Sequence, residues 1–345
     1  MRCTCHIVPQ DVLKRFADDD SFSTEQRKHF ADTMKIDVEL RKLRTQAGKL
    51  TRVASLVGAP MGITAAAAPP AITVFDCNHS QTPPGAQVAD PANAADATAK
   101  RAFVETSSVA AFYLQVFGRN SIDDAGMGMI SSIHFSTGYN NAFWNGSQMT
   151  YGDGDGSIFI DFTLGNDVIA HELTHGVTQH SLQLAYTNEA GGLNESLSDC
   201  FGSMFRQWEA KQDVTQADWM IGKDVVGPGA IAKGYTCLRD LSDPAGSHCL
   251  GAQQVKFSQY KAGMDPHESS GIPNLAFYTI AKAVGGNSWD KVGQIWYKAM
   301  TGFDPTPAMK MKAFADRTRS VAAQLNPGDA AVAGAVDAGW KSVGL

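Results

Sequence analysis

The spacing of apolar and polar positions changes near residue 167. Between residues 70 and 165, apolar residues occur in short runs such as AITVFD, SSIHFS, QMTYGD and SIFIDF, separated by Gly, Asn and Pro. This pattern predicts short strands and tight turns, with one helix over residues 99–117 where apolar residues recur at helical spacing. Beyond this point helical spacing dominates, and it predicts helices over residues 167–180, 194–212, 272–284, 288–301 and 306–323. We therefore expect an α+β fold with a β-rich N-terminal lobe and an α-helical C-terminal lobe.

Residues 1–50 form a region of their own, in which charged residues are denser than in the rest of the chain. Ser23 and Gln26 form a capping box at the start of a helix with an apolar face, and Gly48 can end that helix. A piece of this size buries too little apolar surface to be stable alone. The Ala- and Pro-rich residues 51–70 predict a linker, so residues 1–50 need another surface to lie against.

Composition and charge exclude several classes of function. With 43% hydrophobic and 19% charged residues, the chain has the composition of an ordinary soluble protein. A net charge of −6 and the lack of a basic run argue against a nucleic-acid partner. Gly and Pro interrupt the apolar residues 53–75, so we expect no membrane-spanning helix and no membrane partner.

The six cysteines are scattered, and none forms the C-x-x-C pair of a zinc ribbon or a thioredoxin-type site. Cys237 and Cys249 flank a loop that a disulfide could close in an oxidising compartment, and the sequence leaves this question open. Cys77 and Cys200 are expected to be buried thiols.

The most informative motif is H-E-x-x-H, formed by His171-Glu172-Leu173-Thr174-His175 within a helical stretch. Residues four apart lie on the same face of a helix, so His171 and His175 can bind one metal ion. Glu172 is turned about 100° away, which places its carboxylate beside the metal as a base and not as a ligand. The motif predicts one catalytic Zn²⁺ and requires a third ligand.

Glu195 is the predicted third ligand, in a second helical stretch whose other face is apolar. Two His and one Glu leave the fourth position for water, which is typical of catalytic zinc. Asp199, four residues further on, can accept the free ring N–H of a zinc-bound histidine. The rival hypothesis is a non-catalytic protein that uses zinc for stability. Structural sites usually have four protein ligands and no adjacent base, so Glu172 favours an enzyme.

Three motifs in order, NAFWNGSQMTYGDGDG at 141–156, HELTH at 171–175 and GGLNESLSD at 191–199, resemble the thermolysin family of zinc metalloendopeptidases. The resemblance extends from roughly residue 70 to residue 345. It implies a two-lobed fold with the zinc helix between the lobes and a substrate cleft at their junction. It also implies domain boundaries, with a β-rich lobe over residues 71–187 that includes the zinc helix and an α-helical lobe over residues 188–345.

The same resemblance implies roles for further residues. Glu172 acts as general base and then as general acid, and Tyr186 and His267 stabilise the tetrahedral oxyanion. Arg239 opens the stretch RDLSDPA, which matches the family's Arg-containing segment. The segment around His267 lacks the family's Asp at the usual distance, which leaves Asp265 as a displaced partner.

Family resemblance also implies how a peptide or protein substrate binds. Asn141, Ala142 and Trp144 resemble the edge strand that holds the substrate backbone through β-type hydrogen bonds. The pocket for the residue after the scissile bond is lined by apolar residues, and the expected preference is therefore for a bulky hydrophobic side chain; the lining residues are Phe159, Phe162, Val168 and Leu238.

One region departs from the family, at its double calcium site. Asp167 and Asp218 remain, but Arg206, Met220 and Lys223 replace the other carboxylates. Calcium needs several oxygen ligands, so we expect no calcium at the double site and an ion pair between Arg206 and Asp167 in its place.

The stretch HIVPQDVL at residues 6–13 resembles the short pro-segments of the protealysin-like branch, whose signature is Pro-Pro-x-x-Leu. Gln10 stands where the second Pro would be. The resemblance implies a latent precursor in which residues 1–50 inhibit the enzyme intramolecularly. Residues 51–70 then contain the activation site, because an exposed linker is open to proteolysis.

Two questions about this segment stay open in the sequence. Cys3 or Cys5 could bind the zinc as a thiolate, or residues 1–50 could be a helical hairpin that remains attached and carries surface thiols. The N-terminus has no continuous apolar stretch of a Sec-type signal peptide. We therefore expect secretion by another route, or a cytoplasmic precursor.

Overall fold

The computed structural model describes residues 5–54 and 69–345. Its main sheet has six strands in the order β1-β5-β6-β4-β2-β3. The pairs β2–β4 and β4–β6 are parallel and the others are antiparallel. In chain order the strands are β1 (Cys5–His6), β2 (Ile72–Asp76), β3 (Ala86–Gln87), β4 (Met129–Ile133), β5 (Ala142–Trp144) and β6 (Met149–Tyr151).

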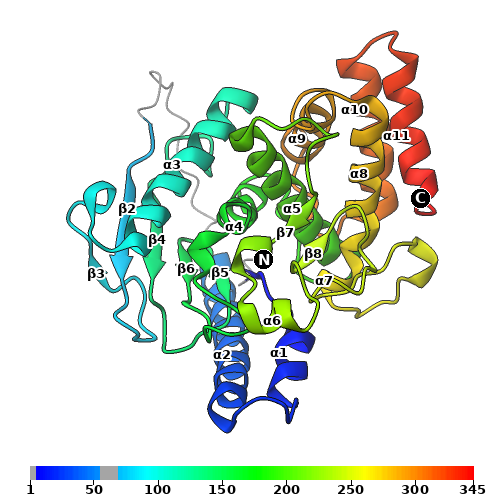
Figure 1. The fold of residues 1–345 in the computed structure, drawn as a ribbon. Helices are drawn as coiled ribbons and strands as arrows, with labels where there is room; N and C mark the ends of the chain where they lie inside the picture. The colour runs from blue at the N-terminus through cyan, green and yellow to red at the C-terminus, as the bar shows by residue number, and fades with distance from the viewer. Residues whose placement is uncertain (1–4, 55–68) are drawn as a thin grey trace.

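Helix α3 (Ala97–Phe117) packs against β2 and β4. Its first turn is capped by Asp96, which accepts a hydrogen bond from the backbone N–H of Thr98, and it ends at Gly118, whose φ of 69° suits a glycine. The sheet and α3 form the N-terminal lobe (Figure 1).

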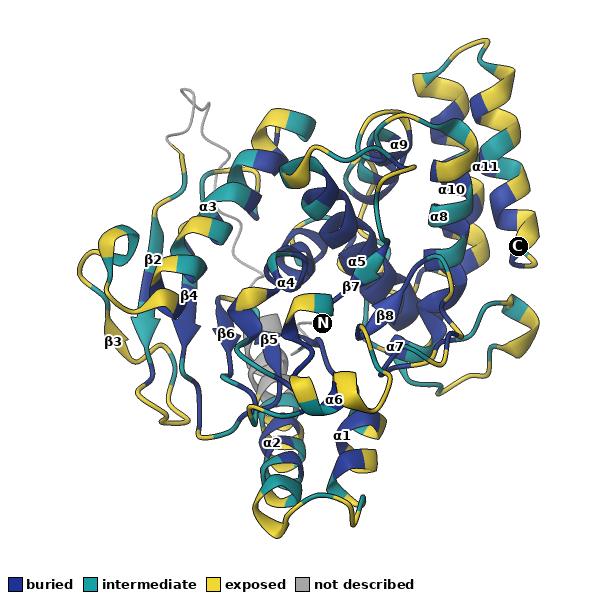
Figure 2. Ribbon diagram, in the orientation of Figure 1, coloured by how far each residue is buried: buried dark blue, intermediate teal, exposed yellow. Residues whose placement is uncertain are grey.

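Two central helices, α4 (Asn166–Gln179) and α5 (Asn188–Ala210), pack against each other between the lobes (Figure 1). Both are buried along most of their length, as the dark blue ribbon of Figure 2 shows. Gly191 and Gly192 lie in the first turns of α5, where a Cβ at Gly192 would lie 2.4 Å from Ser269 Oγ. These glycines therefore allow the short helix α7 (Pro266–Ser269) to approach α5 closely.

The C-terminal lobe is helical, as expected. Trp296 and Trp340 stack at its centre with ring centroids 5.9 Å apart. Its larger helices are α8 (Gly271–Val284), α9 (Lys291–Thr301), α10 (Met311–Leu325) and α11 (Ala330–Ser342). Between α5 and α7 lie the two-stranded sheet of β7 (Met220–Ile221) and β8 (Arg239–Asp240) and the short helix α6 (Pro228–Ala232).

The N-terminal segment, residues 5–54, comprises β1, α1 (Gln10–Ala17) and α2 (Thr24–Ala54). Its two helices pack together below the junction of the lobes (Figure 1). The predicted capping box is present, because Ser23 and Gln26 exchange hydrogen bonds between side chain and backbone N–H. Phe16 and Phe30 are buried between the helices, with ring centroids 5.4 Å apart.

The predicted α+β, two-lobed architecture is confirmed, with three local differences. Gly48 does not end α2, because strong helix formers surround it and outweigh the cost of one glycine, about 1 kcal/mol. SIFIDF is not a strand; Phe159 makes an isolated bridge to Val226, and a 3₁₀ turn follows over Phe162–Leu164. Helix α11 was not predicted, because its Ala- and Gly-rich sequence gives little contrast between faces. Within the described residues, no helix is both long enough and apolar enough to span a bilayer.

Candidate active site

His171 and His175 lie one turn apart on α4 and point their Nε2 atoms at one region of space, 3.0 Å apart. Glu195 on α5 faces them, with Oε2 3.4 Å from His171 Nε2 and Oε1 3.5 Å from His175 Nε2. All three side chains are buried. The packing of α4 on α5 therefore brings the three predicted ligands together from two helices.

The residues fit a zinc ion. Tetrahedral Zn²⁺ bound at about 2.0–2.1 Å holds its N and O ligands about 3.3 Å apart, close to the separations found here. Glu195 Oε2 is buried without a hydrogen-bond partner, a costly state that a cation would relieve. Burial lowers the pKa of His175 to about 3, so this ring is neutral, the form that binds metals.

The other ring nitrogens of the two histidines are also held. His171 Nδ1 lies 2.9 Å from Asp199 Oδ1, as the sequence predicted. His175 Nδ1 lies 2.9 Å from Asn194 Oδ1 and 3.0 Å from Ser198 Oγ. Such contacts fix the tautomer and orientation of metal ligands. Sequence reasoning missed Asn194 and Ser198, although both lie within one turn of Glu195.

Asp199 is fixed in turn by Arg239 on β8, which donates two hydrogen bonds to its carboxylate at 2.8 and 2.9 Å. Asn274 on α8, also missed, donates a third at 2.9 Å. Burial raises the pKa of Asp199, but the charge of Arg239 and the hydrogen bond to His171 outweigh it and lower this pKa to about 2. The carboxylate therefore stays ionised next to His171.

Glu172 lies on α4 beside the ligand group but is not a member of it. Its Oε2 accepts a hydrogen bond from the backbone N–H of Trp144 at 2.8 Å, and its buried Oε1 has no partner. Burial, together with the charge of Glu195, raises the pKa of Glu172 well above its ordinary value. A nearby divalent cation acts in the opposite direction and favours the carboxylate.

Tyr186 and His267 lie on the other side of Glu195. The Tyr186 hydroxyl donates to Glu195 Oε1 and lies 3.3 Å from His267 Nε2. His267 Nδ1 is 2.7 Å from Asp265 Oδ1. Asp265 therefore orients His267 despite its displaced position, because it caps α7 and brings its carboxylate back to the ring.

The N-terminal segment lies along the predicted substrate strand. Cys5 pairs with Trp144 and His6 with Phe143 in antiparallel register, and the Ile7 N–H donates to the Ala142 carbonyl at 3.1 Å. The Asn141 side chain makes two hydrogen bonds to the backbone of Val8, at 2.9 and 3.1 Å.

Two predicted site residues also bind this backbone. His267 Nε2 donates to the His6 carbonyl at 2.6 Å, and Arg239 Nη1 donates to the Ile7 carbonyl at 2.8 Å. The residues predicted for the substrate pocket are buried in the same apolar cluster as Ile7 and Val8; they are Phe159, Phe162, Val168 and Leu238. The backbone contacts expected for a substrate are thus made by residues 6–8.

A buried polar network anchors this strand to α2. Asp37 lies 3.2 Å from His6 Nε2 and accepts hydrogen bonds from Asn141 at 3.0 Å, Gln10 at 3.0 Å and the Tyr139 hydroxyl. Cys5 is buried but is not in the ligand group of His171, His175 and Glu195, so this structure gives no support to its ligation of zinc. Cys3 lies outside the described residues.

The region of the family's double calcium site contains ion pairs. Arg206 Nη1 lies 3.3 Å from the buried Asp167 Oδ2 and 2.7 Å from Asp224 Oδ2. Lys223 Nζ lies 2.6 Å from Asp218 Oδ2. The guanidinium of Arg206 thus occupies the position beside Asp167 as the sequence predicted.

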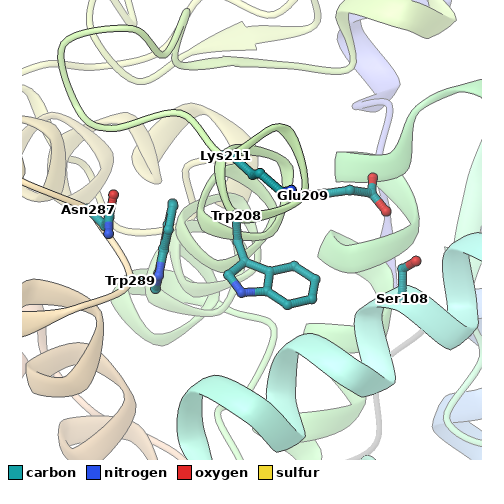
Figure 3. A pocket seen from close by; sticks show the side chains of 6 residues that line it. All are labelled: Ser108, Trp208, Glu209, Lys211, Asn287 and Trp289. Carbon is teal, nitrogen blue, oxygen red and sulfur yellow. The ribbon is translucent and has the colours of Figure 1, made fainter.

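An open pocket of about 660 Å³ lies elsewhere, between α3, α5 and the start of α9 (Figure 3). It is lined by polar side chains and two indole rings, from Ser108, Trp208, Glu209, Lys211, Asn287 and Trp289. None of the predicted site residues lines it, so it is distinct from the site where residues 6–8 lie.

Comparisons with known proteins agree with this geometry. Residues 61–179 match the thermolysin metallopeptidase catalytic domain, and residues 182–345 match the thermolysin metallopeptidase alpha-helical domain. An extracellular metalloprotease of Pectobacterium carotovorum subsp. carotovorum is 38% identical over 79% of this chain and 80% of its own length. A bacillolysin of Bacillus cereus is 37% identical over 79% of this chain and 49% of its own length.

A solved structure extends the similarity to the N-terminal segment. The precursor of protealysin, a metalloproteinase from Serratia proteamaculans, matches with a TM-score of 0.82 and 33% identity, over 99% of both chains. The chain therefore belongs to the thermolysin family of zinc metalloendopeptidases, in its protealysin-like branch.

Proposed function

We propose that this protein is a neutral zinc endopeptidase made as a latent precursor, in which residues 1–50 are an inhibitory pro-segment. The observation that carries the proposal is the hydrogen bond from His267 Nε2 to the His6 carbonyl, at 2.6 Å, next to the β1–β5 pairing. A backbone carbonyl of the chain's own N-terminal segment is held by a residue proposed to bind the reacting carbonyl of a substrate.

In the active form, His171, His175 and Glu195 would hold the zinc. Bound there, zinc would supply Lewis-acid activation of water and polarisation of the scissile carbonyl. Glu172 accepts a proton from the attacking water and then donates it to the leaving amine. Tyr186 and His267 donate hydrogen bonds where the oxyanion develops.

Arg239 fixes Asp199 and donates to a backbone carbonyl, as it does with Ile7 in this structure. Asn141, Ala142 and Trp144 hold the substrate backbone as an added strand. The apolar pocket favours a bulky hydrophobic residue after the scissile bond; its lining comprises Phe159, Phe162, Val168 and Leu238, which belong to the same apolar cluster as Ile7 and Val8.

Zinc-dependent catalysis is tested by hydrolysis of a blocked peptide with and without a chelator, with Glu172→Ala as the inactive control. We expect activity that the chelator removes and added zinc restores. Activity that survives complete removal of the metal would refute the catalytic role of zinc. A series of peptides that differ only in the residue after the scissile bond tests the preference for bulky hydrophobic side chains.

Latency is tested by weakening the contact between the segment and the lobes. Arg15 Nη2 donates to the Leu250 carbonyl at 2.7 Å and its guanidinium lies 5.2 Å from the Tyr235 ring centroid. Arg15→Ala should therefore raise the activity of the uncut chain. Lys14→Ala is the matched control, because Lys14 is exposed and pairs with Asp18 of the same segment.

The activation site is found by adding wild-type enzyme to uncut Glu172→Ala protein. We expect cleavage between about residues 45 and 68, within or close to the linker. An attached helical hairpin without inhibitory function is the alternative, and it predicts that the uncut chain and Arg15→Ala are equally active.

A further inference from the structure

A second group of potential metal ligands lies outside the catalytic centre. Cys237, His248 and Cys249 bring two sulfurs and a ring nitrogen within 4.8 Å of one another. The cysteines are buried, and the His248 side chain is 32% exposed. We propose that these residues bind a second zinc ion, which has a structural role.

The separations match a tetrahedral site. Cys237 Sγ lies 3.7 Å from Cys249 Sγ, and Cys249 Sγ lies 3.7 Å from His248 Nε2. With Zn–S of about 2.3 Å and Zn–N of about 2.0 Å, a tetrahedral ion holds two sulfurs about 3.8 Å apart and sulfur and nitrogen about 3.5 Å apart. A disulfide instead needs its sulfurs about 2 Å apart. Both separations thus fit ligands of one ion, and the third pair, Cys237 and His248, lies within 4.8 Å.

The backbone holds the ligands in this arrangement. Cys237 and Cys249 are joined by a parallel bridge, in which Leu250 N–H donates to the Cys237 carbonyl and Thr236 N–H to the His248 carbonyl, both at 2.9 Å. A Cβ at Gly246 would lie 2.3 Å from the His248 ring. The glycine therefore leaves the space in which the imidazole folds back towards the thiols.

The surrounding charge favours a cation. Asp240 Oδ2 lies 3.1 Å from His248 Nε2, so a carboxylate adjoins the three ligands. The Asp243 carbonyl lies 4.0 Å from Cys249 Sγ. Thiolate and imidazole together select zinc over hard cations such as calcium or magnesium.

The proposed ion joins two segments that both contact the N-terminal segment. Two residues after Cys237, Arg239 binds the Ile7 carbonyl, and directly after Cys249, the Leu250 carbonyl accepts from Arg15. The second zinc would therefore brace the two segments that contact Ile7 and Arg15 of the N-terminal segment. This role is independent of the proposed catalysis.

Cobalt substitution tests the site without reference to activity, because thiolate ligands give Co²⁺ a sulfur-to-metal charge-transfer band in the near ultraviolet. The full chain, purified with a reducing agent, is loaded with Co²⁺ and its metal content is measured. We expect two ions per chain and a thiolate band. His175→Ala should keep the band and one ion, because it damages only the catalytic centre.

Substitutions at the new site provide the complementary test. Cys237→Ser with Cys249→Ser should lose the band and one ion but keep the catalytic ion, whereas Cys3→Ser with Cys5→Ser should keep the band. If the first variant fails to fold, His248→Ala provides the measurement, with an expected loss of affinity for the second ion of at least about 10-fold. His79→Ala is its control, because His79 is exposed and also faces an aspartate, at 3.5 Å.

Three results would overturn the proposal. The first is a single bound ion per wild-type chain. The second is loss of the thiolate band in the Cys3→Ser, Cys5→Ser variant. The third is a Cys237–Cys249 disulfide in freshly isolated protein, if the protein still binds only one ion after that disulfide is reduced.

Discussion

Among the buried carboxylates of the helix pair α4–α5, two at different places are compensated in different ways. At one, Glu195 faces two histidines and has a carboxylate oxygen without a hydrogen-bond partner. At the other, Asp167 in the first turn of α4 faces Arg206 near the end of α5, at 3.3 Å. Both carboxylates are fully buried. The first place lacks a fixed positive charge opposite the carboxylate, and the second contains one.

A buried carboxylate needs a compensating charge. At the first place an ion bound by the two imidazoles would supply that charge, whereas at the second a guanidinium supplies it permanently. The comparison predicts that the residue opposite the carboxylate decides which of the two sites binds a metal in this chain.

The largest expected effect is at the metal centre. Glu172→Ala should retain zinc and reduce turnover by about 10³-fold or more, because it removes the base and not a ligand. His175→Ala should lose both zinc and activity. Metal analysis and peptide hydrolysis of the two purified, activated variants check this. A zinc-free Glu172→Ala protein, or one with nearly full activity, would show that the roles are assigned wrongly.

At the other place, Arg206→Met should destabilise the protein by about 3–5 kcal/mol, because it leaves Asp167 buried without its partner. Lys223→Met is the matched control, since the Lys223–Asp218 pair is partly exposed and should contribute about 1 kcal/mol or less. Denaturant unfolding of both variants measures the difference. Equal decreases in the free energy of unfolding of the two variants would mean that Arg206 does not compensate a buried charge.

A partly exposed charge cluster should give a smaller effect. His134 lies 2.8 Å from Asp153 and 2.9 Å from Asp96, and the bond to Asp153 is the main cause that raises its pKa from 6.5 to about 9. Because the folded-state pKa is the higher one, this stabilisation is complete below pH 6.5 and is lost as pH rises through about 9. Solvent screening limits it to about 1 kcal/mol. His134→Gln should flatten the change in unfolding free energy between these pH values, and an unchanged profile would exclude His134 as its source.

The smallest expected effect is that of calcium. With Arg206 and Lys223 paired to the remaining aspartates, the double site should not bind the ion. The melting temperature should therefore be the same in excess calcium and in a calcium-selective chelator. A large calcium-dependent rise in melting temperature that persists in Asp218→Asn would indicate another calcium site. A rise that Asp218→Asn abolishes would show that the double site binds calcium after all.

The sequence was sufficient for the parts of the site that depend on local geometry. The i, i+4 spacing of His171 and His175 placed two ligands on one helix face, and Glu195 and Asp199 followed from the same rule on the next helix. The order of strands before helices gave the two lobes. Family resemblance identified the β5 edge and the position of His267.

Most contacts between distant segments could not be predicted, the Arg206–Asp167 pair being an exception. Strand β1 has only two residues, and its pairing with β5 joins positions more than 130 residues apart, so no periodicity in the chain reveals it. The same holds for Asn274, which reaches Asp199 from another helix. Asn194 and Ser198 lie next to known site residues, but which ring each one contacts depends on how α5 packs on α4.

The central claim is that the N-terminal segment blocks a complete active site. The most direct measurement compares initial rates of blocked-peptide hydrolysis by the intact chain and by the chain cut in the linker and freed of its N-terminal segment, with zinc content measured in both. The account predicts equal zinc at the catalytic centre, negligible activity before cleavage and full activity after it. Equal activity of intact and cut protein at equal zinc would contradict it.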